Sequence, residues 1–481
     1  MHLNINFLPQ RRGAIAGELV AQLFGLLDDG LVEGDLGDLQ VHLDWIQYKS
    51  NFREPFIVRH GIDVHGAAIP MSELAVDLRQ FQDTGTRESL RQAVTHLSNG
   101  HGRESDHLWL DEFTTHSQSL IWKFNQLFWV RLADWESASG KGFEAALPGG
   151  QSDANDDAAV SDAVADFWTL LVDLDRHHQL PEQLFALEIG VGTGRRAAMW
   201  LDHFKRLDGD RGTGYYQRLH FLLGDYALAT LDSAASLLDR HQSVVNTIAM
   251  DAINPMRSLS FLRYKVLSIH LTNVYDNLPA DELARRDGQL YVVEVRPYLT
   301  GSAARQLSET YGIPVNELPQ ATRRLLEAGP SFLGHRDRGV QFWRELWEGM
   351  RLEERLRRVD GVADVPLPPG LNSYHLEDLL AEAPDDVRFQ LSNGAAQSFL
   401  NTLPLLHPRG YLQVQDIFVP TMNDYREGFR GPGKMDGSVL NWVNGALLKA
   451  VAARAGYDVH FSPYHYRANS RTTILYTTPR D

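Results

Sequence analysis

The chain has 481 residues, with 46 Lys and Arg against 62 Asp and Glu, so its net charge is −16 at pH 7. This balance argues against a nonspecific nucleic-acid binder, because such binding depends on Lys and Arg that neutralise phosphates. The absence of cysteine excludes disulfides, thiolate metal sites and a cysteine nucleophile. No apolar run reaches the ~18 residues of a membrane span, and residues 1–13 lack a secretory pattern. We therefore expect a cytoplasmic protein that binds neither nucleic acid nor membrane.

Residues 1–160 are expected to form a mainly helical region that caps the site or binds substrate. Leucines recur at helical spacing in 14–35, residues 38–66 resemble short strands, and 106–136 is aromatic and mostly helical. The segment 147–162 contains few apolar residues. It is either a linker or an ordered loop across the mouth of a binding site, and the loop is favoured because such loops often carry function.

From residue 163 onward, apolar strands alternate with helices. Strands are expected at 184–190, 219–224, 244–250, 265–272, 411–419, 457–462 and 471–478, with helices at 163–176, 195–207, 226–240 and 438–455. Continuous apolar strands are typical of a parallel sheet covered on both faces. The last two strands are too close for a helical crossover, so they should pair antiparallel.

The fold class expected is therefore α/β, a doubly wound, seven-stranded, mostly parallel sheet of the Rossmann-like kind. Residues 161–279 and 405–481 should form this core. Residues 280–404 should form a large insertion between the fourth and fifth strands that covers the carboxyl edge as a lid or substrate segment. It should contain a strand at 289–295 and helices at 302–310, 315–328 and 339–358.

A glycine-rich turn follows the first strand of this core and reads Glu188-Ile-Gly190-Val-Gly192-Thr-Gly194. Glycines let a backbone turn tightly and approach a ligand closely. The dinucleotide pattern would need glycine at Arg195, and the Gly-Lys-Ser/Thr of a phosphate-binding loop is absent. The remaining common match is the methyltransferase pattern E/D-x-G-x-G-x-G, so the turn indicates a site for S-adenosyl-L-methionine.

Acidic residues follow the next two strands, where the ribose and adenine of this cofactor would need acceptors. Asp225 could accept from the ribose hydroxyls, Asp251 from the adenine amine, and the N–H of Ala252 could serve a ring nitrogen. Aspartates at strand ends are also common helix caps, which is the alternative for both.

The fourth strand ends in Asn273-Val-Tyr-Asp276-Asn-Leu-Pro279, where methyl donor and acceptor would meet. A carboxylate or amide there could hold a nucleophilic nitrogen or oxygen and accept its proton, so Asn273 and Asp276 are the catalytic candidates. The alternative is a turn in which both side chains bond their own backbone.

These motifs resemble the MidA-like group of class I S-adenosylmethionine-dependent methyltransferases, a family that includes a methyltransferase acting on a protein arginine. Asp276–Pro279 looks like the family's D-A-L-P, Asp287–Leu290 like the strand start that follows it, and Gly410–Asp416 like its G-x-x-x-x-x-D strand. Asn273 stands where the family has Glu. The resemblance implies the Rossmann-like fold, the cofactor and a nitrogen acceptor on a protein.

Three functional hypotheses remain open from the sequence. The chain could methylate a protein side chain, methylate a small biosynthetic molecule, or bind the cofactor without catalysis as an assembly or interaction protein. In each case a homodimer is possible on this sequence, and no metal site is expected.

Overall fold

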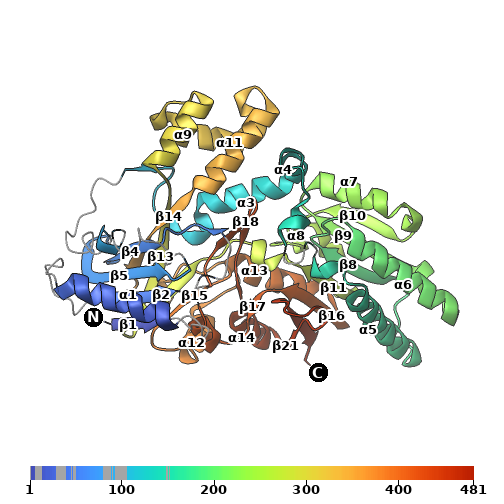
Figure 1. The fold of residues 1–481 in the computed structure, drawn as a ribbon. Helices are drawn as coiled ribbons and strands as arrows, with labels where there is room; N and C mark the ends of the chain where they lie inside the picture. Colours follow the sequence, from blue (N-terminus) through green and yellow to red (C-terminus); the bar gives the residue numbers. More distant parts are fainter. Residues whose placement is uncertain are drawn as a thin grey trace.

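The computed structural model describes residues 2–5, 13–28, 39–44, 46, 50–79, 88, 90–92, 106–147, 150, 152–428 and 430–480. Within these residues the strands form two large sheets, one of ten strands and one of seven. Figure 1 shows the ten-stranded sheet at the left and the seven-stranded sheet at the right, with helix α3 (Leu120–Val130) lying between them. Among the described helices, none is both long and apolar enough to cross a membrane.

The seven-stranded sheet has the strand order β10-β9-β8-β11-β16-β22-β21. All neighbours run parallel except β22, which is antiparallel to β16 and β21, so the antiparallel pairing expected for the last two strands is confirmed. The bounds are β8 (Leu184–Ile189), β9 (Leu219–Asp225), β10 (Val245–Ala249), β11 (Val266–Thr272), β16 (Leu406–Asp416), β21 (Tyr457–Pro463) and β22 (Thr473–Pro479).

Helices cover both faces of this sheet because its strands carry apolar residues on both sides. Strand β8 shows this: Ala186 packs into one core with Phe167 and Phe204, whereas Leu187 and Ile189 pack into another. The covering helices on the first face are α5 (Asp157–Arg176), α6 (Arg195–Arg211) and α7 (Leu228–Leu237). On the second face they are α12 (Ser373–Ala381), α13 (Asn393–Thr402) and α14 (Gly445–Ala455).

The ten-stranded sheet corrects the expectation of a mainly helical N-terminal region. Residues 2–77 supply four of its strands, and the expected insertion supplies four more in the same sheet. Its main path runs β1 (His2–Ile5), β2 (Leu39–Asp44), β5 (Ala68–Asp77), β4 (Phe56–Ile62), β14 (Arg351–Arg358), β13 (Gln289–Thr300), β12 (Glu282–Arg286) and β15 (Val387–Gln390). Strands β6 (His107–Trp109) and β7 (Thr114–Thr115) add to β13.

Strand β14 was expected as the end of a helix, and that expectation is wrong. Its buried residues are Leu352, Glu354 and Leu356, which alternate with more exposed ones at the period of two that a strand requires. The helix before it, α11 (Arg336–Gly349), ends where Met350 adopts extended backbone. The high charge of residues 351–358 hid this alternation in the sequence.

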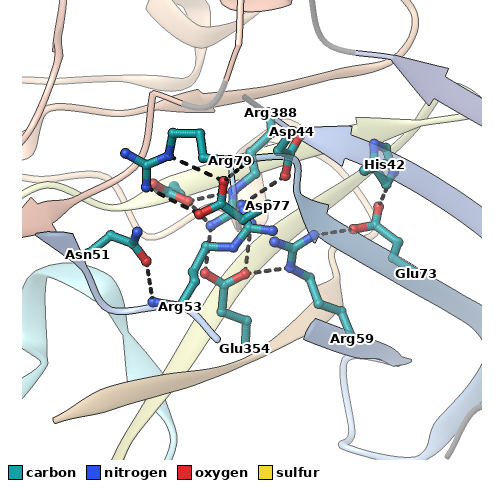
Figure 2. A network of polar contacts seen from close by, with 11 residues as sticks. His42, Asp44, Asn51, Arg53, Arg59, Glu73, Asp77, Arg79, Glu354 and Arg388 are labelled. Atoms are coloured by element: carbon teal, nitrogen blue, oxygen red, sulfur yellow. Dashed lines mark hydrogen bonds and ion pairs between the residues drawn. The ribbon is translucent and has the colours of Figure 1, made fainter. Parts of the chain in front are cut away.

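A network of buried ion pairs joins the N-terminal strands to those of the insertion (Figure 2). Arg59 of β4 pairs with Glu73 of β5 and Glu354 of β14, and Glu354 also pairs with Arg388 of β15. Arg286 of β12 reaches Glu73 as well, at 2.6 Å. Arg53 pairs with Asp44 at the end of β2. The two sequence segments therefore share one polar interior and behave as one structural unit.

A third core, rich in aromatic residues, packs α3 and α4 (Leu132–Ser139) against α9 (Gly301–Tyr311), α10 (Leu318–Ala328) and α11. Trp135 and Trp343 meet edge to face there, with ring centroids 4.7 Å apart. The buried aromatic residues of 106–136 pack in this core together with Trp343 and Trp347. A groove of about 640 Å³ lies outside this core between α3 and α10.

Helices α1 and α8 and five small strands are the other α-helices and strands that the structure describes. They are α1 (Gly13–Asp28), α8 (Met256–Leu259) and the small strands β3 (Ser50–Asn51), β17 (Phe418–Val419), β18 (Gly433–Met435), β19 (Ser438–Leu440) and β20 (Val443–Asn444).

Candidate functional site

The candidate site lies where β8 and β11 run side by side in the seven-stranded sheet. From β8 the chain proceeds outward to β9 and β10, whereas from β11 it proceeds to β16 on the other side. Open α/β sheets bind ligands in the crevice at the carboxyl ends of the strands where the order reverses in this way. The glycine turn after β8 and the Asn273 turn after β11 both lie at this edge.

The three glycines of the first turn all adopt left-handed backbone, with φ of 76° at Gly190, 51° at Gly192 and 75° at Gly194. A Cβ at Gly190 would lie 2.4 Å from a methyl of Val274, and a Cβ at Gly194 would lie 2.9 Å from the Cβ of Ala234. A Cβ at Gly192 would meet nothing within 4 Å. The outer two glycines are therefore needed for packing, and the middle one borders open space.

Glu188 is buried beneath this turn, with its carboxylate 2.7 Å from the guanidinium of Arg196 on α6. Burial raises the pKa of the Glu188 carboxyl, and the positive charge of Arg196 opposes that rise. This contact fixes the first turn of α6 to β8. The structure thus places Glu188 beside the predicted cofactor site and engages one of its oxygens with Arg196.

Asp225 ends β9 and bonds directly to the glycine turn. Its carboxylate accepts hydrogen bonds from the backbone N–H groups of Ala227, at 2.9 Å, and Val191. Burial raises the pKa of this carboxyl, while the backbone donors hold it down. Asp225 therefore bonds the turn between β9 and α7 and does not cap the helix, because the N-cap of α7 is Ala227 and no side chain caps it.

Asp251 and Ala252 follow β10, next to Asp225 across the sheet edge. Asp251 is exposed, and its carboxylate accepts from the N–H of Ile253 at 2.9 Å. Ala252 is half-buried. Tyr226, which the sequence did not single out, lies close to both carboxylates; partial burial and then the charges of Asp225 and Asp251 raise its pKa. Its only sequence signal is its place directly after Asp225.

The second turn, after β11, begins at Asn273 with left-handed backbone, φ 52°. Asn273 is half-buried, and its carbonyl accepts from the side chain of Asn277 at 3.2 Å. The same Asn277 amide donates to the carboxyl of Asp276 at 2.8 Å. The two predicted catalytic residues are thus brought together through Asn277. Asp276 bonds within its own turn, as the alternative expected.

Asp276 shares its buried surroundings with Asp416, the last residue of β16. The carboxylate of Asp416 accepts from the N–H of Tyr275 at 2.8 Å, Asp276 at 3.2 Å and Ile417 at 2.8 Å. Burial raises the pKa of Asp416 to about 7, and burial together with the neighbouring Asp416 raises that of Asp276 well above its ordinary range. Asp416 therefore fixes the turn through the backbone N–H groups of Tyr275 and Asp276. The sequence pointed to it only through the family resemblance.

Helix α3 fixes the same turn through hydrogen bonds to Asn277. The side-chain amide of Asn125 donates to the carbonyl of Asn277 at 2.8 Å, and the indole N–H of Trp129 donates to its side-chain oxygen at 3.0 Å. No motif in the sequence indicates this contact, because its partners are about 150 positions apart and α3 reads as ordinary aromatic core.

The segment 147–162 is ordered where the structure describes it. Asp153 is buried and bonds to Ser470 and Thr472 in the connection between β21 and β22, each at 2.6 Å. Just before it, Glu144 accepts from Asn155 at 3.0 Å and lies 3.8 Å from Arg195, the residue that follows the glycine turn. This supports the loop interpretation over a free linker.

No family model matches the chain, and no curated protein matches it significantly. Among solved structures, the chain is similar to a Burkholderia thailandensis protein bound to S-adenosyl-homocysteine and described as a candidate methyl transferase, at 10% identity over 76% of this chain and 88% of that chain, with a TM-score of 0.44. It is also similar to the 1,6-didemethyltoxoflavin-N1-methyltransferase of the same organism (10% identity, 67% and 89% covered, TM-score 0.27) and to the [4+2]-cyclase SpnF (11%, 76% and 97%, TM-score 0.33). These similarities are low, so the functional argument rests on this chain's own residues.

Proposed function

We propose that the chain is a class I S-adenosylmethionine-dependent methyltransferase that transfers a methyl group to a nitrogen or oxygen acceptor. The observation that carries the proposal is the open side of Gly192, at the edge where β8 and β11 run side by side, with Asp225 on one flank and Asn273 on the other. A dinucleotide would bring a pyrophosphate, which favours a different glycine spacing and a helix N-terminus free to receive it.

The residues at this edge suit the chemistry of the cofactor. Backbone at Gly190–Gly194 can approach the adenosyl amino acid closely, Asp225 can accept from the ribose diol, and Asp251 with the N–H of Ala252 can meet the adenine edge. The Asp251 carboxylate accepts from the N–H of Ile253, and the Asp225 carboxylate accepts from those of Ala227 and Val191. A carboxylate offers about four acceptor positions, so both retain acceptor capacity. Glu188 supports the turn through Arg196. When bound, the cofactor supplies an electrophilic methyl on a sulfonium.

The contribution of the chain to transfer is positional. The turn at 273–277, held by Asp416 below and α3 above, would fix the acceptor in line with the methyl. Residues 143–155 and α3 would keep water away from the reacting atoms. Because the sulfonium loses its positive charge during transfer, a site without an unpaired carboxylate next to the sulfur suits the reaction.

Several finer features belong to this proposal. Residues 161–279 and 405–481 form the cofactor-binding unit, and the ten-stranded unit covers its carboxyl edge and meets the acceptor. The enzyme is cytoplasmic, is related to the MidA-like methyltransferases, and acts as a monomer or homodimer. The noncatalytic alternative, a cofactor-binding assembly protein, is disfavoured by the amount of structure that converges on Asn277.

Calorimetry with S-adenosylmethionine and S-adenosylhomocysteine tests the proposal. Both should bind, and Gly192→Val should abolish binding because the new side chain fills the open space. Gly212→Val is the matched control: Gly212 also has left-handed backbone, φ 66°, and open surroundings, but it lies at the far end of α6. Absence of binding to the unmodified chain, or equal effects of the two substitutions, would contradict the proposal.

A further inference from the structure

We call the turn at residues 273–277 the acceptor turn. A continuous series of contacts connects the glycine turn to the acceptor turn along the open edge of the sheet. Arg195 lies 3.8 Å from Glu144, and the neighbouring Phe143 packs edge to face on Trp129 with ring centroids 5.4 Å apart. The indole N–H of Trp129 then donates to Asn277 at 3.0 Å. Phe143 and Trp129 are both half-buried, so their rings present surface between the two turns. We call Trp129 and Phe143 the aromatic wall.

The polar groups opposite the aromatic wall are amides and engaged acids. Asn273 and Asn277 are both half-buried at the turn, where the Asn277 NH2 donates to the Asn273 carbonyl and to Asp276 and its side-chain oxygen accepts from Trp129. Of the acids on the described elements around it, Glu188 is paired with Arg196, Glu144 is held by Asn155 and Arg195, and Asp276 is buried and bonded to Asn277. Burial and the neighbouring Asp416 also raise the pKa of Asp276, which favours its uncharged form. Among these described acids, and with Asp225 and Asp251 assigned to the cofactor, a cationic acceptor would find no unpaired carboxylate to replace its lost hydration.

We infer that the methyl acceptor is an uncharged, ring-bearing small molecule whose N–H or O–H nucleophile is held by the Asn273 and Asn277 amides while its ring packs on the aromatic wall. This inference rests on the proposed function and names its substrate class. Planar rings gain packing energy from edge-to-face contacts with aromatic side chains, and amides satisfy neutral donors and acceptors without requiring a charge. It argues against the guanidinium acceptor that the family resemblance implies.

The transfer balances with such an acceptor. The lone pair of its nitrogen or oxygen forms the new bond to the methyl carbon, and the carbon–sulfur bond breaks, so the sulfonium becomes a neutral thioether. The proton of the acceptor N–H or O–H then leaves to solvent water. The amide oxygen of Asn277 can accept a hydrogen bond from that N–H or O–H and so orient the lone pair toward the methyl.

Isotope-labelled transfer identifies the acceptor class directly. The full chain is incubated with S-adenosylmethionine that carries a deuterated methyl and with a cell extract that contains both proteins and small molecules. Labelled products are then identified by mass spectrometry. The inference predicts label in a compound that contains a ring and is neutral at pH 7. Label in methylarginine or methyllysine after protein hydrolysis, or in a product without a ring, would overturn it.

Failure of the inference and of the proposed function give different results. If the cofactor binds and label enters arginine, the acceptor class is wrong and the transferase is retained. If the cofactor binds and no fraction is labelled, the transferase itself is contradicted. If the cofactor does not bind, the site assignment fails before the acceptor is considered.

A substitution in the aromatic wall supplies a second readout. Trp129→Leu removes the ring, so the KM for the identified acceptor should rise about tenfold while the Kd of S-adenosylmethionine stays the same. Trp168→Leu is the matched control, because Trp168 is also half-buried but packs on Phe204 and Tyr215 beneath α6. An unchanged KM in Trp129→Leu would contradict the role of the wall.

Discussion

The three glycines of the turn after β8 have different physical reasons for being glycine, which makes them separable by experiment. At Gly194 the missing Cβ lets α6 approach α7. An added Cβ would lie 2.9 Å from the Cβ of Ala234 and 3.0 Å from its Cα. At Gly192 the missing Cβ leaves space beside the predicted cofactor. A shared sequence motif therefore combines a packing requirement with a binding requirement.

Gly194→Ala should lower the free energy of unfolding by about 2–5 kcal/mol, because the clash with Ala234 costs ~1–3 kcal/mol and the left-handed backbone a further ~1–2 kcal/mol. Gly192→Ala should cost less stability, because its Cβ has room and only the left-handed backbone is strained, at about 1–2 kcal/mol. Denaturant unfolding of the two variants checks the order. Equal losses, or a larger loss for Gly192→Ala, would contradict the geometry of the turn.

The Asp276 and Asp416 pair should make stability depend on pH. Both carboxyls have a raised pKa in the folded chain, Asp416 to about 7. Raised carboxyl pKa values mean that the folded chain holds more protons than the unfolded chain between pH ~4 and pH ~7. The stabilising contribution of the protonated pair is thus present below pH ~4 and is lost as pH rises through the folded pKa values.

Asp276→Asn removes one titrating group and the charge that opposes ionisation of Asp416. The fall in unfolding free energy between pH 5 and pH 8 should become shallower, by at most about 1.4 kcal/mol per pH unit for each proton no longer taken up. Denaturant unfolding at several pH values measures the slope. Asp251→Asn, at an exposed position, should leave it unchanged. A steeper slope in Asp276→Asn would contradict the pairing.

At the scale of elements, α3 is the piece that joins the two sheets at the acceptor turn. Asn125 of α3 bonds two separate segments: its Nδ2 donates to the Asn277 carbonyl at 2.8 Å, and its Oδ1 accepts from the N–H of Val439 in β19 at 2.9 Å. Asn125 is buried, so its loss leaves a donor and an acceptor without partners.

Asn125→Ala should therefore destabilise the chain by about 2–6 kcal/mol, from two unsatisfied backbone groups at ~1–3 kcal/mol each. It should also raise amide hydrogen exchange at residues 275–278 more than at β9 or β10. Gln126→Ala, on the exposed side of the same helix, is the control. Unchanged exchange in the turn would show that α3 does not hold it.

A strand could be predicted from the sequence where charged residues do not obscure its hydrophobic pattern. The strands at 184–190, 219–224 and 265–272 are continuous and apolar, and the structure places β8, β9 and β11 there. Strand β14 was missed because its outward face is Arg and Glu and one inward residue, Glu354, is also charged. Strand β5, which lies beyond the short strands expected at 38–66, likewise hides the charged Glu73 in the interior.

At the scale of the whole molecule, the correct prediction of the seven-stranded unit and the wrong prediction of the N-terminal region have one cause. The first unit is built around continuous apolar strands such as β8, β9 and β11, so local patterns reveal it. The ten-stranded unit is built from segments hundreds of residues apart, joined by ion pairs such as Arg59 with Glu354, a separation of 295 positions. Such pairing is visible only in three dimensions.

Breaking that ion network should destabilise β4 and β15 together, although the two strands lie far apart in the sequence. Glu354→Gln removes the buried carboxylate that Arg59 and Arg388 share, so that Arg59 keeps only Glu73 and Arg388 only Glu282 of these partners, and loss of one partner of a buried pair typically costs about 3–5 kcal/mol. Hydrogen exchange should rise at β4 and β15 together. Glu353→Gln, on the outward face of the same strand, is the control. Exchange that rises in the N-terminal strands alone would contradict a single unit.

A crystal structure of the full chain grown with S-adenosylhomocysteine tests the central claim most directly. The account predicts the adenosyl amino acid against the backbone of Gly192, with its ribose at Asp225, its adenine toward Asp251 and its sulfur facing Asn273. A phosphate-bearing ligand in that place, or a crevice closed by the protein's own side chains with the nucleoside absent or elsewhere, would contradict it.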